Sequence, residues 1–238
     1  GPAMPDQITV GEVLALYAQE RAPRLSSPER AGYALKALTP FWGDLTCDAV
    51  RGATCRRYVT QRNASDGTIR RELATLQAAL TFAHREGLLV YPVAVTLPPR
   101  PQDRDRWFTR DELAAILRES PPMLRRLILL GAGTGTRVSA LIALRWVPSF
   151  DTGWIDLERG VLHRRGASER ETTKRRGSVR LTRRLLSHCR RWQRMGGEWV
   201  INYASKDTAR QAFNRACART GIEDARLHDL KRTAVTIA

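Results

Sequence analysis

The sequence predicts a mainly helical protein with one small antiparallel sheet, divided into two domains. Apolar residues recur at helical spacing through most of the chain, strand signals occur only between residues 154 and 181, and a segment rich in proline and charge interrupts the helical pattern at 97–106. We therefore expect a tail at 1–7 that resembles a tag remnant, a helical domain at 8–96, a linker at 97–106 and a second domain at 107–238.

The first domain is expected to be a bundle of four amphipathic helices. Thr9 is a candidate N-cap, Ser27 before a proline marks a second start, and a third helix begins near Thr54. The fourth helix is the clearest, because it ends at Gly87 and its apolar residues recur at steps of three and four, namely Ile69, Leu73, Leu76, Leu80 and Ala83. Four such helices with short loops form a small bundle.

The second domain mixes helices with short strands. Thr109 and Glu112 have the spacing of a capping box, which predicts a helix start. The apolar residues 127–130 run into a turn of small residues, after which helical periodicity resumes at Val138. Strands are expected at 154–157, 161–163 and 178–181, and helices around 185–192, around 209–217 and from residue 228 onward.

The charge balance points to a polyanionic partner. The chain has 40 Lys and Arg against 24 Asp and Glu, a net charge of +16, while its hydrophobic fraction of 42% excludes a disordered basic tail. Nucleic acid is the commonest partner of such a fold, and a basic solubilising surface is the alternative. Residues 159–194 hold 13 Lys and Arg and two acidic residues, so most of the charge belongs to the small sheet and the helix after it.

Several other classes of protein are excluded. No apolar run approaches the roughly 18 residues of a membrane span, and nothing near residue 1 resembles a signal peptide. The four cysteines lie far apart without a CxxC pair, so neither a disulfide framework nor a zinc site is predicted. We expect a cytoplasmic protein with reduced cysteines.

Three basic motifs are candidates for chemistry. Arg137 follows a Gly/Thr-rich turn that lacks the Walker lysine, and its guanidinium could grip two phosphate oxygens at a helix start. Lys174, with Arg175 and Arg176 after it, lies between two predicted strands, as a basic hairpin tip or a solvated turn. His228 and Lys231 share one face of a helix, while Arg232 is rotated away by about 100°.

A further basic group lies in the first domain. Arg62, Arg70 and Arg71 cluster around the start of the clearest helix, off its apolar stripe. Their two interpretations, contact with phosphate and an ordinary solvated face, are equally favoured by the pattern.

The order of these motifs resembles the tyrosine recombinases of the phage integrase family. The resemblance rests on residues 134–146 before the strands, on Lys174 in a hairpin, on the box His228-Asp229-Leu230-Lys231-Arg232-Thr233, and on residues 68–109 upstream. It implies a helical core-binding (SAM-like) bundle followed by an α+β catalytic domain, which together close around duplex DNA. It further implies site-specific recombination, in which a tyrosine forms a 3′-phosphotyrosyl bond without metal or ATP, carried out by a tetramer on DNA. A bacterial or phage-encoded protein at the nucleoid is expected.

The resemblance also assigns roles. Arg137 matches the first catalytic arginine, which holds the non-bridging oxygens, and Lys174 matches the hairpin lysine, which acts as general acid toward the 5′-oxygen. His228 matches the histidine that holds or shuttles a proton at the phosphate. The remaining matched position is the second catalytic arginine, where this chain has Lys231, which keeps the charge and loses the bidentate fork. Arg62, Arg70, Arg71, Arg175 and Arg176 are the expected contacts to the DNA backbone.

The nucleophile has no counterpart in this sequence. All five tyrosines precede His228, whereas the family's tyrosine follows that box. We therefore expect a chain truncated before its nucleophile, which binds DNA and does not cleave it. A non-catalytic DNA-binding regulatory protein that retains the recombinase fold is the alternative hypothesis, and an RNA-binding protein is a weaker one.

Overall fold

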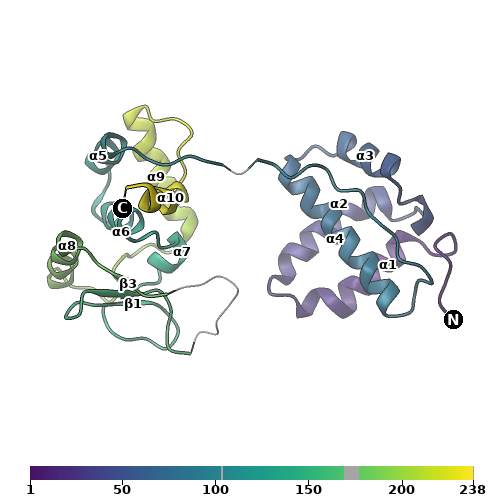
Figure 1. Cartoon of the computed structure of the whole chain (residues 1–238), viewed down its shortest axis with the longest axis horizontal. Helices are drawn as coiled ribbons and strands as arrows, with labels where there is room; N and C mark the ends of the chain where they lie inside the picture. The colour runs from purple at the N-terminus through teal and green to yellow at the C-terminus, as the bar shows by residue number, and fades with distance from the viewer. Residues whose placement is uncertain (103, 169–176, 238) are drawn as a thin grey trace. The chain divides into compact units, whose positions relative to one another are not determined.

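The computed structural model describes residues 1–102, 104–168 and 177–237, which form two compact units. The first unit comprises residues 1–103 and the second residues 104–238, so the boundary falls within the segment 97–106. Figure 1 shows helices α1–α4 in one unit and the remaining helices with the sheet in the other. Mainly helical structure with one small antiparallel sheet confirms the predicted fold class.

The first unit is a helical bundle around one apolar core. Its helices are α1 (Val10–Leu16), α2 (Pro28–Trp42), α3 (Gly52–Gln61) and α4 (Asp66–Arg85), with a π-helical turn at Tyr17–Arg21 and 3-10 turns at Ala22–Arg24 and Cys47–Ala49. Thr9 caps α1 in a capping box with Glu12. After α4 the chain turns at Gly87, whose φ is +74°, a conformation that glycine adopts without strain. The bundle predicted for this domain is thus present.

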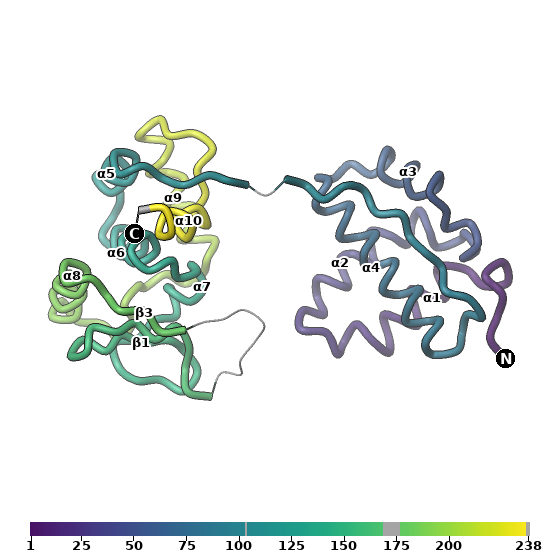
Figure 2. Tube along the Cα trace, in the orientation of Figure 1, coloured from purple at the N-terminus to yellow at the C-terminus, as the bar shows by residue number. Residues whose placement is uncertain are grey.

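Two extended segments cover the bundle. The chain after α4 runs back along that helix (Figure 2), held by Gln77, whose side chain bonds the backbone of Val93 and Val95 at 3.0 and 2.7 Å. Near residue 1, the amide of Ala3 donates to the carbonyl of Leu88 at 2.8 Å. Residues predicted as a tail therefore pack against the domain.

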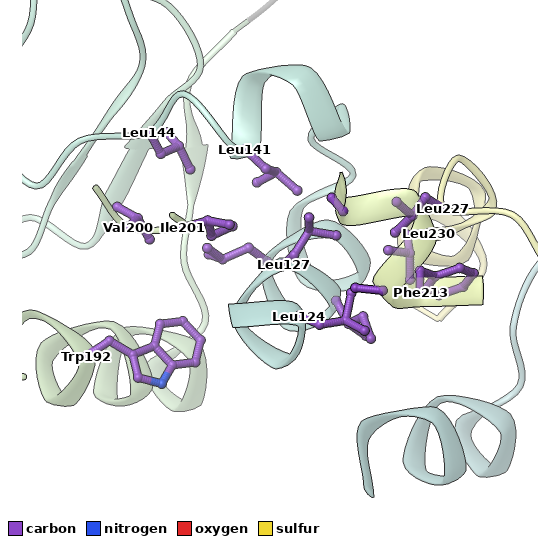
Figure 3. Close-up of a cluster of buried hydrophobic side chains, with 14 of the residues drawn as sticks. Leu124, Leu127, Leu141, Leu144, Trp192, Val200, Ile201, Phe213, Leu227 and Leu230 are labelled. Atoms are coloured by element: carbon purple, nitrogen blue, oxygen red, sulfur yellow. The ribbon is translucent and has the colours of Figure 1, made fainter. Parts of the chain in front are cut away.

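The second unit is built around helix α6 (Pro122–Thr134). Figure 3 shows Leu127 of this helix at the centre of the core, with Leu227 and Leu230 on one side and Val200 and Ile201 on the other. Around it lie α5 (Arg110–Arg118), α7 (Val138–Leu141), α8 (Arg183–Arg194), α9 (Lys206–Thr220) and α10 (Asp229–Ile237). The predicted box of Thr109 and Glu112 caps α5.

A three-stranded antiparallel sheet completes the second unit. Strands β1 (Trp154–Asp156), β2 (Val161–His163) and β3 (Val179–Arg180) pair in this order, with Ile155 opposite Leu162 and Leu162 opposite Val179. Ile155 and Leu162 point into the core, as period-two alternation requires. The strands therefore fall where the sequence predicts them, and β1 and β3 are shorter than predicted.

Helix α6 differs from its prediction. The glycine-rich residues after 130 read as a turn, yet the helix continues to Thr134 and ends at Gly135, which is left-handed with φ +64°. Packing explains why glycines occur inside this helix. A Cβ on Gly133 would lie 2.9 Å from the Leu185 side chain, and a Cβ on Gly131 would lie 3.3 Å from the Leu230 side chain. The glycines let α8 and α10 approach the α6 backbone closely.

The four cysteines, Cys47, Cys55, Cys189 and Cys217, are all buried free thiols. Burial raises the pKa of Cys47 and of Cys217 to about 11, and that of Cys189 to about 12. None of these thiols is therefore appreciably ionised at neutral pH.

Candidate functional site

The turn that carries Arg137 is held together by threonines. The Thr134 hydroxyl donates to the carbonyl of Leu130 at 2.6 Å and lies 2.7 Å from the Thr136 hydroxyl. Both threonines are buried, whereas Arg137 is half-buried at the start of α7. Among the described residues, Arg137 has no ion pair or side-chain hydrogen bond. A rigid turn therefore presents a guanidinium whose donors are available.

Helix α10 packs against this turn. A Cβ on Gly135 would lie 3.4 Å from the Ala234 Cβ and 3.7 Å from the carbonyl oxygen of Lys231. The structure thus brings the backbone of the Arg137 turn beside that of Lys231, although the two are 94 positions apart by their numbers. Two of the three basic motifs meet at this contact.

His228 lies one residue before α10, not within it. Its ring is exposed, and its carbonyl accepts the amide of Lys231 at 3.1 Å, so the two residues flank the first turn of the helix. Arg232 points elsewhere and pairs with Asp105 at 2.9 Å. The sequence predicts that Arg232 is rotated away from His228 and Lys231, and its partner Asp105 belongs to the segment before α5.

Asp229 anchors the start of α10 to the beginning of the second unit. Its carboxylate, only 2% exposed, accepts the Nε of Arg104 at 3.1 Å and a terminal nitrogen of the same guanidinium at 2.9 Å. It also accepts the amide of Arg226 at 2.9 Å. Hydrogen bonds to Asp229 and Asp224 raise the pKa of Arg104. The charged pair therefore fixes the backbone on either side of His228.

A second contact secures the same segment. The Phe108 amide donates to the Thr233 hydroxyl at 2.9 Å, and that hydroxyl donates to the carbonyl of Asp229 at 2.9 Å. Residues 104–108 consequently run across the first turns of α10, and the Arg137 turn packs against the same helix at Lys231 and Ala234. The sequence did not reveal Arg104 and Asp229 as a pair, since the two residues are 125 positions apart.

Arg164, just after β2, is a further basic residue at this turn. Its Nε donates to the Thr136 hydroxyl at 3.1 Å, and a terminal nitrogen donates to the carbonyl of Thr134. Burial and the nearby charge of Arg137 lower the pKa of Arg164. The sequence counted Arg164 within the basic region but did not single it out.

The hairpin residues predicted as Lys174, Arg175 and Arg176 lie outside the described residues. Over residues 1–102, 104–168 and 177–237, no cluster of His, Cys, Asp and Glu is suited to a metal ion. No helix in the same ranges is long and apolar enough to cross a membrane.

The first unit contains an open groove of about 1010 Å³. Its lining combines basic and aromatic side chains from α2, α3 and α4, among them Arg30, Tyr33, Lys36, Arg62 and Arg71. Tyr33 is 75% exposed, and Arg71 is exposed. A basic groove with an exposed ring has the chemistry of a nucleic-acid contact surface.

The three arginines predicted as DNA contacts differ in their surroundings. Arg62 pairs with the buried Glu72 at 2.8 Å, and Glu72 also accepts the Tyr58 hydroxyl at 2.7 Å. Arg70 donates to the carbonyl of Pro98. Arg71 faces the groove. Arg62 and Arg70 therefore hold parts of the unit together, which their spacing in the sequence did not reveal.

Comparison with known proteins agrees with this fold. No family model matches the sequence. The integrase of Salmonella phage P22 is 27% identical over 175 residues, a match that covers 68% of this chain and 44% of the phage protein. The chain thus spans less than half the length of that relative.

Solved structures match along nearly the whole chain. A lambda integrase dimer bound to a COC′ core site superposes with a TM-score of 0.71 at 19% identity, covering 95% of this chain and 69% of that one. The Tn1549 transposon integrase in complex with transposon right end DNA gives a TM-score of 0.75 at 14% identity, covering 97% and 86%. The chain therefore has the fold of the core-binding and catalytic domains of lambda integrase, and it is similar in sequence to a phage integrase.

Proposed function

We propose that this chain is the core-binding and catalytic part of a site-specific DNA recombinase that acts through a 3′-phosphotyrosyl intermediate. The observation that carries the proposal is the contact between the Arg137 turn and α10 beside Lys231. Two basic motifs that the sequence singled out separately thereby meet at one place, and similarity to a phage integrase supports the same function.

In this mechanism the fixed cations stabilise charge on the phosphate. Arg137 holds the two non-bridging oxygens, and Lys231 adds a second positive charge from α10. His228 holds a proton at the phosphate, and Lys174 gives one to the departing 5′-oxygen. A pentavalent phosphate gains negative charge as it forms, so cations already in place lower its energy without metal or cofactor.

Lys231 makes this site weaker than one with two arginines. A lysine ammonium is a point charge, whereas a guanidinium donates two parallel hydrogen bonds to one phosphate. The variant Lys231→Arg is therefore expected to strengthen the hold on phosphate. Lys231 is only half-buried in the first turn of α10, so its side chain is not enclosed by the core.

No tyrosine is assigned as the nucleophile. The five tyrosines all precede His228, and in the second unit Tyr203 is the only one. We propose that residues 1–238 bind DNA and that strand cleavage requires a tyrosine that these residues do not supply. The proposal predicts that this polypeptide forms no covalent complex with DNA and that a form with the nucleophilic tyrosine does. The alternative, a regulatory protein without catalytic activity, predicts no covalent complex from either.

The basic groove of the first unit is proposed to hold the DNA backbone, with Arg71 at a phosphate. Lambda integrase structures include a tetramer bound to a Holliday junction, and we propose that a tetramer of the complete protein forms likewise on DNA. The contacts of the groove would be made mostly to phosphate groups, so they would carry little information about the base sequence.

A binding titration tests the proposal. Fluorescence anisotropy of a labelled duplex should give an affinity whose logarithm falls linearly with the logarithm of salt concentration. Arg71→Ala should weaken binding and reduce that slope by about 1. Arg85→Ala is the matched control, because Arg85 is exposed about 20 Å further along α4. A salt-independent affinity, or preference for structured RNA over duplex DNA, would overturn the proposal.

A further inference from the structure

Arg164 joins the sheet to the turn that carries Arg137. It follows β2 directly, and its guanidinium donates to two oxygens of one turn, the Thr136 hydroxyl and the Thr134 carbonyl. A lysine cannot reproduce this pair of separate donor nitrogens, Nε and a terminal nitrogen, because its three donors share one nitrogen. The contact is therefore specific to arginine.

The turn that receives these bonds is buried. Thr134 is 7% and Thr136 3% exposed, and their hydroxyls bond one another and the end of α6. Arg164 adds donors to a network in which the hydroxyl of Thr136 and the carbonyl of Thr134 accept. Without it, the buried carbonyl of Thr134 would lose this partner, which costs free energy.

Arg164 also places a positive charge close to Arg137. No acidic side chain pairs with either arginine among the described residues, and burial together with Arg137 lowers the pKa of Arg164. Two like charges held near each other repel, so Arg137 gains nothing by folding toward the turn. An anion that reaches Arg137 relieves the repulsion between the two.

We propose that Arg164 is a positioning residue for phosphate binding by Arg137. Its two hydrogen bonds fix the turn, and its charge directs the Arg137 guanidinium outward toward the phosphodiester. The inference rests on the proposed function, because it assumes that Arg137 binds phosphate. It adds a residue just after β2 to the helix ends that carry Arg137 and Lys231.

Inorganic phosphate titrated into ¹⁵N-arginine-labelled protein tests the inference, with the Arg137 Nε–H signal identified by its loss in Arg137→Ala. The wild-type signal should shift on binding. Arg164→Met and Thr136→Val should each weaken phosphate binding about tenfold, the effect of losing a hydrogen bond to a charged group. Arg164→Lys should be closer to Arg164→Met than to the wild type, since it retains charge and loses the paired bonds.

Arg159→Met is the matched control, because Arg159 lies between β1 and β2 with 85% of its side chain exposed. It should bind phosphate as the wild type does. Thr136→Val preserves side-chain shape, so the test stands even where Arg164→Met fails to fold.

The possible results separate the two proposals. Wild-type affinity in both Arg164→Lys and Thr136→Val would overturn the positioning role and leave phosphate binding by Arg137 intact. An Arg137 signal that does not move with phosphate in the wild type would overturn the proposed phosphate site, and the positioning role with it.

Discussion

Replacing Arg104 by Met should destabilise the second unit strongly. The change removes the guanidinium that binds Asp229, whose side chain is 3% exposed, while Arg104 itself is 24% exposed. Breaking one side of a buried ion pair costs about 3–5 kcal/mol, because a charge is left without its partner. The expected loss is about 3 kcal/mol, at the lower end of this range. Arg104 is partly exposed, and Asp229 keeps its hydrogen bond from the amide of Arg226.

Tryptophan fluorescence during urea unfolding measures this loss. Five of the six tryptophans belong to the second unit, so the signal reports mainly on that unit. A loss of this size corresponds to a fall in Tm of about 10 °C for a unit of this length. The double variant with Asp229→Asn should regain part of the stability, because it removes the unpaired buried charge.

Arg219→Met provides the comparison. Arg219 pairs with Glu119 at 3.1 Å, with side chains 50% and 43% exposed, so its loss should cost under about 1 kcal/mol. Equal losses from Arg104→Met and Arg219→Met would refute the view that the buried carboxylate of Asp229 depends on Arg104.

Two further predictions concern the second unit. Hydrogen bonding from Arg106 lowers the pKa of Glu112 below its ordinary value of 4.5, so this pair stabilises the fold above that value and its contribution is lost as the pH falls through the lowered pKa. Glu112→Gln should therefore flatten the fall in unfolding free energy as the pH drops below 4.5. An unchanged acid slope would contradict the assignment. Gly166→Ala should lower Tm, since a Cβ at this position would lie 2.0 Å from the carbonyl oxygen of Phe150. Gly177→Ala is the control and should leave Tm unchanged, because its Cβ meets nothing within 4 Å. Equal Tm values for the two variants would count against the packing described.

Local signals in the sequence predicted local structure well. The box of Thr109 and Glu112 caps α5, and Gly87 ends the turn after α4, because each depends on residues three or four positions apart. The sequence predicts a turn where α6 still continues, since the close approach of Leu185 that favours glycine there comes from another helix. Periodicity cannot reveal such a contact.

In the candidate site, too, residues within local motifs could be predicted and residues with distant partners could not. Arg137, His228 and Lys231 were singled out from their motifs, and their roles stay predictions. Arg104 and Arg164 could not be found, because their partners lie 125 and about 30 positions away. Arg62 likewise has a structural partner, Glu72, that its place beside other basic residues did not indicate.

The buried thiols of Cys47, Cys55, Cys189 and Cys217 have a practical consequence. A maleimide dye reacts with an accessible thiolate, and these four cysteines are sheltered in both cores and hold their protons at neutral pH. A single cysteine introduced at an exposed position, such as Arg85→Cys, would be labelled selectively while the four buried cysteines stay in place. A pair of such labels, one in each unit, would allow energy transfer to follow the distance between the units as DNA is added.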